Sequence, residues 1–191
     1  MHLRSTGEAA RKSQRPPLPF RSVTEGSDGD AAGSCASSTG YDLWDRTQEA
    51  GHQVAAQYER MLGAASDRAR VAVAPDFLQR VRQLLTLRLV AVARDRRQAF
   101  PQSVPPARRE TVAALWAEVF WAARAQSSDD DSGVLEATDA VIRGLLALDP
   151  QDLARADTVR AWWARLASVE ETFGGLEMQA QAALEVRREV Y

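Results

Sequence analysis

The chain has 191 residues, of which 45% are hydrophobic and 26% are charged, and its formal net charge is −2. A chain of this length forms one hydrophobic core, and its near-neutral charge excludes both a polyanion mimic and a general basic nucleic-acid binder, so any electrostatic function has to be local. A single cysteine, Cys35, excludes an internal disulfide and a cysteine-rich zinc site, and the longest apolar run falls well short of the ~20 residues that cross a bilayer.

Residues 1–40 form a leader that is rich in proline, glycine and serine and poor in large apolar side chains. Because it can bury so little apolar surface, the entropy lost on ordering is not offset, and we expect the leader to be disordered. Its stretch 16–21, PPLPFR, fits a short polyproline ligand, although an ordinary polar tail is the preferred interpretation. The leader lacks the apolar stretch of a secretory signal, so we expect a cytoplasmic protein, with an organelle transit peptide as a minor alternative.

From residue 41 onward, apolar residues recur at spacings of three and four, which is typical of one face of a helix, and no segment alternates as a strand does. This pattern predicts an all-α domain over 41–191, a bundle of four to five mainly antiparallel helices with short connections. The expected helices cover about 42–63, 76–98, 106–126, 134–148 and 157–190, with one short helical turn before the last of them.

Local signals place the ends of these helices. Pro75 is expected to open the second helix, because proline is favoured in a first turn. The acidic run 129–131 is expected to be a loop before the fourth helix, and Asp149 is expected to cap the short turn that follows it. The glycine pair 174–175 is expected to interrupt or kink the last helix. The second helix is apolar on all sides in its middle, so we expect it to be the central helix or one that needs a partner protein.

The motifs that carry chemistry each lack a required partner. Glu49 and His52 have the Glu-x-x-His spacing of a di-iron bundle, but His52 is the one histidine outside the leader, so a second copy is missing. The acidic run 129–131 suits magnesium, but its serine and glycine neighbours favour a solvated loop. The sequence contains no nucleophilic catalytic set and no phosphate-binding or dinucleotide fingerprint. It leans against an enzyme and indicates no cofactor and no metal, although carboxylate catalysis stays open among 26 acidic residues.

Charge is divided along the chain. From 78 to 109, eight arginines stand against one acid, Asp95, whereas from 110 to the end seven arginines stand against fifteen acids. Internal neutralisation, in which the basic helix packs against acidic ones, is the preferred explanation. The alternative is an anion-binding patch, although the early arginines point in several directions on a helix, which disfavours a single stripe for a DNA groove. The candidate anion-binding residues are Arg94, Arg96, Arg97, Arg108 and Arg109.

Five tryptophans are more than the core of one small bundle needs. Trp121 follows Trp116 by five positions and leaves its apolar stripe, while the adjacent Trp162 and Trp163 point about 100° apart on a helix. Exposed aromatic side chains dominate binding hot spots. Trp121, Trp162 and Trp163 are therefore the candidate partner-binding residues.

These observations leave three hypotheses for the function. The first is a non-catalytic helical interaction protein, an adaptor, small subunit or assembly factor that binds another protein or forms a homo-oligomer. The second is nucleic-acid or polyanion binding through the arginine-rich region 78–109, for which steep weakening with salt is the diagnostic. The third is an amphipathic coat on a lipid or polymer surface.

Overall fold

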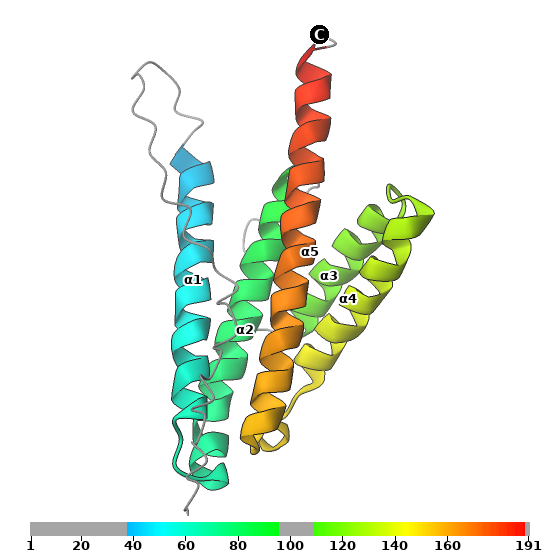
Figure 1. Cartoon of the computed structure of the whole chain (residues 1–191). Coiled ribbons are helices and arrows are strands. Elements are labelled where there is room, and N and C mark those ends of the chain that lie inside the picture. The colour runs from blue at the N-terminus through cyan, green and yellow to red at the C-terminus, as the bar shows by residue number, and fades with distance from the viewer. Residues whose placement is uncertain (1–37, 96–108, 190–191) are drawn as a thin grey trace, which may run out of the picture.

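The computed structural model of the protein describes the backbone of residues 38–95 and 109–189 and the side chains of residues 42–93 and 110–179. These ranges contain five α-helices, one short 3₁₀ helix and no strand, which confirms the predicted all-α class (Figure 1). The helices are α1 (Ser38–Leu62), α2 (Asp67–Asp95), α3 (Arg109–Arg124), α4 (Asp129–Ala147), η1 (Pro150–Leu153) and α5 (Ala156–Glu189). The predicted disordered leader 1–40 lies outside the described residues, apart from 38–40, which already belong to α1.

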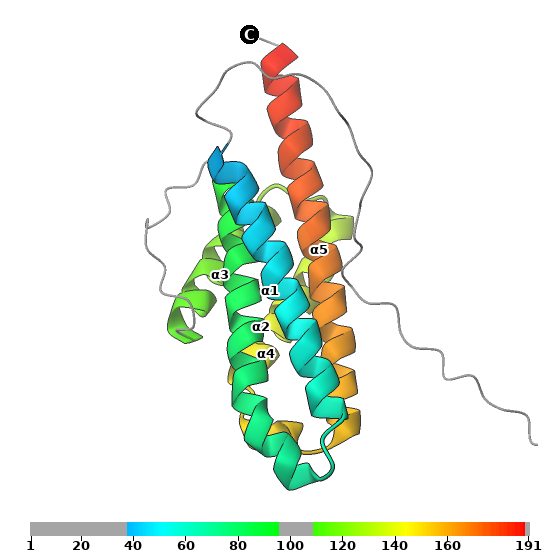
Figure 2. The ribbon, with the colours of Figure 1, turned by 90° about the vertical axis from the view of Figure 1, so that its left-hand side faces the viewer.

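Most neighbouring helices run antiparallel, as the sequence predicts (Figures 1 and 2). Cross-helix hydrogen bonds show this for α1 and α2, where Arg80 Nη1 donates to Gln53 and Arg70 Nε donates to the carbonyl of Met61, nearer the connecting turn. The exceptions are α2 with α3 and α2 with α5, which point in the same direction. Residues 96–108, which link α2 to α3, lie outside the described residues.

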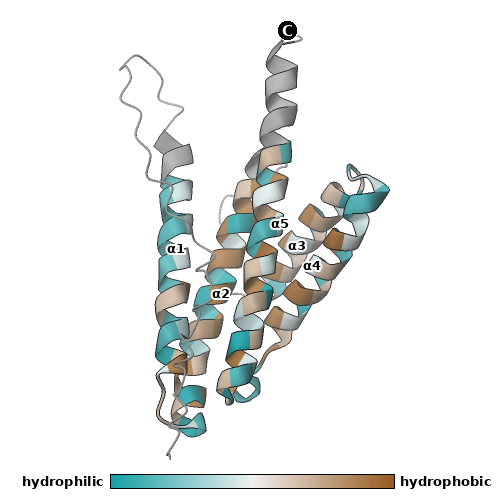
Figure 3. Ribbon diagram, viewed as in Figure 1, coloured by the Kyte–Doolittle hydropathy of each residue, from teal (hydrophilic) through white to brown (hydrophobic). Residues whose placement is uncertain are grey.

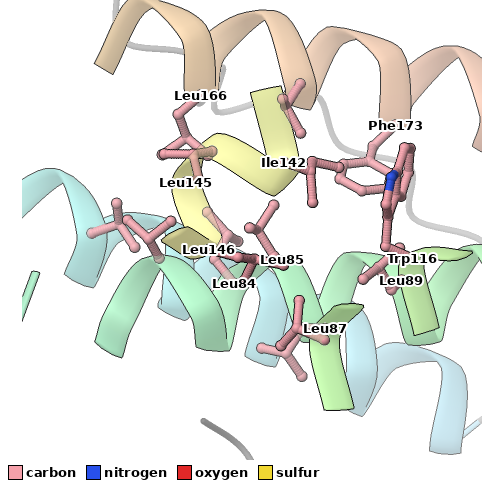
Figure 4. Packing of buried hydrophobic residues seen from close by; sticks show 14 of the residues in the cluster. Leu84, Leu85, Leu87, Leu89, Trp116, Ile142, Leu145, Leu146, Leu166 and Phe173 are labelled. Carbon is pink, nitrogen blue, oxygen red and sulfur yellow. The ribbon is translucent and has the colours of Figure 1, made fainter. Parts of the chain in front are cut away.

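Helix α2 lies at the centre of the bundle, in contact with α1, α3, α5 and η1. Its four consecutive residues 84–87 are all buried, so this stretch has no solvent-facing side. Figure 4 shows Leu84 and Leu85 packed among leucines of α4 and α5. The prediction that a helix apolar on all sides is buried inside the bundle is therefore confirmed.

The start of α2 differs from the sequence-based expectation. The helix begins at Asp67, not at Pro75, because Ser66 caps it: the Ser66 hydroxyl accepts a hydrogen bond from the backbone N–H of Ala69 at 3.2 Å, and its carbonyl accepts one from Arg70 at 2.9 Å. Pro75 then lies within the helix, where it removes one backbone hydrogen bond on an exposed side. Packing of the buried residues around it holds the helix together.

Two further boundary predictions are wrong. The acidic run 129–131 forms the first turn of α4 and not a loop, because Ser128 takes an extended conformation and its carbonyl accepts the N–H of Asp131 at 3.1 Å. Negative charge at this end also complements the helix dipole. Helix α5 continues without a break through Gly174 and Gly175, since Phe173 and Leu176 are buried on either side of the pair.

The junction between α4 and α5 follows the sequence closely. Asp149 and Asp152 form a capping box around Pro150, which occupies the first turn of η1. The predicted inward side chains of α4 are also buried, and they are Leu135, Thr138, Ile142 and Leu145. Together these residues fix α4 against α5 and set the surfaces that the two helices leave exposed.

Candidate functional site

The three candidate tryptophans lie in three different environments. Trp163 is only 3% exposed, and its ring stacks on that of Tyr58 with centroids 4.2 Å apart and planes 10° from parallel. It belongs to the core between α1 and α5 and is not exposed at the surface of the described bundle. Helical spacing alone does not separate it from its neighbour Trp162, because both lie near the edge of the same apolar face.

Trp162 is half-buried and packs on its own chain. An added Cβ at Gly144 would lie 2.6 Å from atom Cη2 of the Trp162 ring, which shows how closely the ring approaches the backbone of α4. The guanidinium of Arg165 lies over the ring, 4.5 Å from its centre. Trp162 is thus in contact with Arg165 and close to Gly144, and it is less exposed than Trp121.

Trp121 is the candidate that remains exposed, with 64% of its surface accessible. It lies on the outer side of α3, where its ring makes an edge contact with Phe120 at a centroid distance of 5.5 Å. The outer side of α3 around it carries Ala114, Ala117 and Ala125, whose small side chains leave the ring accessible. We call this surface the Trp121 face.

Three more large apolar side chains are exposed among the residues whose side chains are described: Trp44 on α1, Val134 on α4 and Met178 on α5, at 58%, 55% and 68%. The sequence pattern does not single out Val134 or Met178, because each is adjacent to core positions along the chain. Hydropathy along the ribbon shows the hydrophobic bands of α3 and α4 in brown (Figure 3).

An open groove of about 310 Å³ lies where the start of α4 and the end of α3 meet α5. We call it the α4–α5 groove. Its apolar lining includes two buried leucines and the half-exposed Val134. Its acidic lining comes from one residue of α4 and one of α5. Gly175 leaves the α5 side of the groove open. These residues are Asp131, Val134, Leu135, Glu171, Gly175 and Leu176.

Arg88, which belongs to region 78–109, forms ion pairs with acids of another helix and is neutralised internally. Its guanidinium pairs with Glu170 at 2.8 Å and with Glu177 at 3.5 Å, both on α5. Burial raises the pKa of Glu170 above its ordinary value, against the opposing effect of Arg88. The side chains of the candidate anion-binding residues Arg94, Arg96, Arg97, Arg108 and Arg109 all lie outside the described residues.

The motifs with catalytic or metal-binding spacing are solvent-exposed. His52 is exposed on α1, and Glu49 accepts a hydrogen bond from Gln53 and not from a histidine. Among the residues that the structure describes, no group of three histidine, cysteine, aspartate or glutamate side chains is placed to hold a metal ion. No helix in the same part of the chain is long and apolar enough to cross a membrane.

Comparisons with known protein families, with curated proteins and with solved structures find no match to this chain. The candidate site therefore rests on geometry alone.

Proposed function

We propose that the chain is a non-catalytic helical interaction protein, which binds another protein or a second copy of itself through the Trp121 face. The observation that carries the proposal is the 64% exposure of Trp121 on a bundle whose core is complete without it. The core that the structure describes contains six buried aromatic rings, which are Tyr58, Phe77, Trp116, Phe120, Trp163 and Phe173. Binding hot spots are enriched in tryptophan and other aromatic residues, so an exposed tryptophan is a candidate anchor.

The free energy available at this residue is large enough to matter. Aromatic side chains bury roughly 150–250 Å², and covering apolar surface contributes about 25 cal/mol per Å². Covering the accessible part of Trp121 is therefore worth roughly 3 kcal/mol, about a hundredfold in affinity. That contribution is comparable to a measured hot spot, and it needs no change in the bundle.

The charges on the same side of α3 indicate the chemistry of the partner. Glu110 and Glu118 are exposed there, and the nearest cation of the helix, Arg124, is paired with Glu136 of α4. A partner that fits this surface has an apolar pocket for the ring and positive charges around it. The wide apolar faces that suggested a lipid coat are instead buried against one another inside the bundle.

Site-specific photo-crosslinking tests the proposal. A photoreactive phenylalanine derivative replaces Trp121 in the full chain, and the matched control carries it at Trp44, the other strongly exposed tryptophan. We expect one discrete protein adduct from position 121 that is absent from position 44. An adduct with twice the mass of the chain identifies a second copy as the partner.

Three outcomes contradict the proposal. They are the absence of any protein adduct from position 121, equal adducts from both positions, and an adduct to nucleic acid. Trp121→Ala provides a check on folding, because removal of a largely exposed side chain is expected to change the free energy of unfolding by less than about 0.5 kcal/mol.

A further inference from the structure

The α4–α5 groove has features that the packing of the bundle does not require. Gly175 lies inside a continuous helix, where glycine costs about 1 kcal/mol relative to alanine. A Cβ added at Gly175 meets no atom within 4 Å, so no close approach within the described chain explains the glycine. Its effect is to keep the α5 side of the groove open.

The lining of the groove specifies the chemistry of an occupant. Leu135 and Leu176 form a buried apolar floor, and Val134 extends it toward solvent. Asp131 and Glu171 are exposed on the two sides, and no cation belongs to the lining. At about 310 Å³ the groove holds a few side chains, so it suits a peptide with apolar residues flanked by positive charges.

The chain itself contains such a segment before α1. Residues 11–21, RKSQRPPLPFR, have four cations and no acid, and the apolar stretch lies between Arg15 and Arg21. A polyproline helix has three residues per turn, which places Pro17 and Phe20 on one side of it. Such a helix loses little entropy on binding because it is already extended.

The segment can reach the groove. Residues 22–37 separate it from α1, and 16 residues of extended chain span up to about 50 Å. The start of α1 and the junction of α3 with α4, beside the groove, lie at the same end of the bundle (Figure 1). Linkage through so short a tether also raises the effective concentration of the segment at the groove.

We propose that residues 11–21 bind in the α4–α5 groove of their own chain, with Pro17 and Phe20 on its apolar floor and Arg15 and Arg21 beside Asp131 and Glu171. This interaction would cover Val134 and leave the Trp121 face on α3 free. It is independent of the proposed function, because it uses a different surface.

Photo-crosslinking from the leader tests this proposal in the full chain. A photoreactive derivative replaces Phe20, and mass spectrometry maps the adducts. We expect intramolecular adducts within 131–135 or 171–179. Gly175→Leu fills the groove, and Gly174→Leu is the matched control, because neither glycine has an atom within 4 Å of an added Cβ and only Gly175 lines the groove. The first variant is expected to lower the adduct yield about tenfold, equivalent to about 1.4 kcal/mol, and the second to leave it unchanged.

A charge test keeps the proposal falsifiable if Gly175→Leu fails to fold. Glu171→Arg reverses an exposed groove residue, and Glu118→Arg reverses an exposed acid outside the groove. We expect only the first to reduce the intramolecular adduct. Adducts between two chains would assign the groove to a second copy and overturn binding within one chain. Adducts scattered over the surface, or none, would overturn the proposal entirely.

Discussion

Arg88 of α2 directs two of its nitrogens at a single oxygen of Glu170 on α5. Its Nε lies 2.9 Å and its Nη2 2.8 Å from Glu170 Oε2, and the Glu170 side chain is only 5% exposed. The other carboxylate oxygen, Oε1, is buried and has no hydrogen-bond partner among the described residues. The carboxylate is thus paired on one side and unsolvated on the other, which explains why burial raises its pKa despite the adjacent cation.

The pH dependence of stability follows from the raised pKa of Glu170. A carboxyl group with a folded pKa above its unfolded value contributes most to stability below its ordinary pKa of 4.5, and the contribution is lost as the pH rises through the raised pKa. Glu170→Gln keeps the shape and an acceptor for Arg88 but does not titrate. We expect the wild type to lose stability relative to this variant from about pH 4.5 upward, as measured by urea unfolding from about pH 4 to pH 8. A constant difference across that range would contradict the raised pKa.

Removal of Arg88, in contrast to Glu170→Gln, is expected to lower the free energy of unfolding at neutral pH. Arg88→Met leaves Glu170 buried without its cation, and breaking a buried pair in this way costs about 3 kcal/mol, at the lower end of such values because the carboxyl group can take up a proton. Arg80→Met is the matched control, since Arg80 on the same helix hydrogen-bonds the neutral Gln53 and is expected to lose less than about 1 kcal/mol. Equal losses in the two variants would show that Glu170 is not the cause.

The charge pattern of the sequence predicts this pairing only in outline. A basic region 78–109 and an acidic second half favour internal neutralisation, and Arg88 shows it directly. Which arginine is neutralised could not be predicted, because helical spacing gives the face of a residue but not the helix opposite to it. Arg88 faces α5 because α2 and α5 run side by side in the same direction.

A close contact between Gly144 and Trp162 gives a second test of the packing. The Cβ of Gly144→Ala would lie 2.6 Å from the Trp162 ring, so the ring has to move and loses its contact with Arg165. Overpacking costs about 1–3 kcal/mol, and the better helix propensity of alanine offsets up to about 1 kcal/mol of it. We expect a net loss of about 1 kcal/mol in the free energy of unfolding.

The control for this test lies on the same helix. Gly133 has no atom within 4 Å of an added Cβ, so Gly133→Ala is expected to gain about 0.5–1 kcal/mol from helix propensity alone. Opposite signs for the two variants, measured by thermal and urea unfolding, would establish that the Trp162 contact is tight. A gain in both would show that the ring moves away at no cost.

The tryptophans show which exposures helical spacing predicts and which it does not. The departure of Trp121 from the stripe of Trp116 correctly indicates an exposed residue, because α3 has one buried side and the core lies beneath it. Trp162 and Trp163 lie on α5, which contacts α1, α2 and α4, so its apolar sides are not confined to one stripe. The ring of Tyr58 on α1 decides that Trp163 is buried, and no local pattern contains that contact.

The true start of α2 had a local signal that the proline obscured. Ser66 and Asp67 are a favourable cap and first-turn acid, but Pro75 has an equally good place in a first turn, and both satisfy the same rules. What decides between them is Arg70, which is 6% exposed and ties the first turn of α2 to its surroundings. A buried arginine with partners from distant residues is a tertiary feature, so composition and spacing do not contain it.

Arg70 therefore gives the most specific prediction, since its guanidinium donates to three backbone carbonyls and also pairs with Asp67 at 2.8 Å. Its Nε donates to the carbonyl of Met61 at 3.0 Å, its Nη2 to that of Ala64 at 3.2 Å, and its Nη1 to that of Ala154 at 2.6 Å. Lysine has one nitrogen and cannot reach three separated carbonyls. Arg70→Lys is expected to lose about 2–3 kcal/mol, because buried carbonyls are left without donors.

Arg68→Lys is the matched control, because Arg68 lies on the same turn and is exposed. It is expected to change the free energy of unfolding by less than about 0.5 kcal/mol. Both are measured by urea unfolding, with an unchanged denaturant slope as the check that the two variants share one native state. Equal stabilities for the two lysine variants would mean that Arg70 acts through its charge and not through its hydrogen bonds to the three carbonyls. Arginine would then have no structural advantage over lysine at this position.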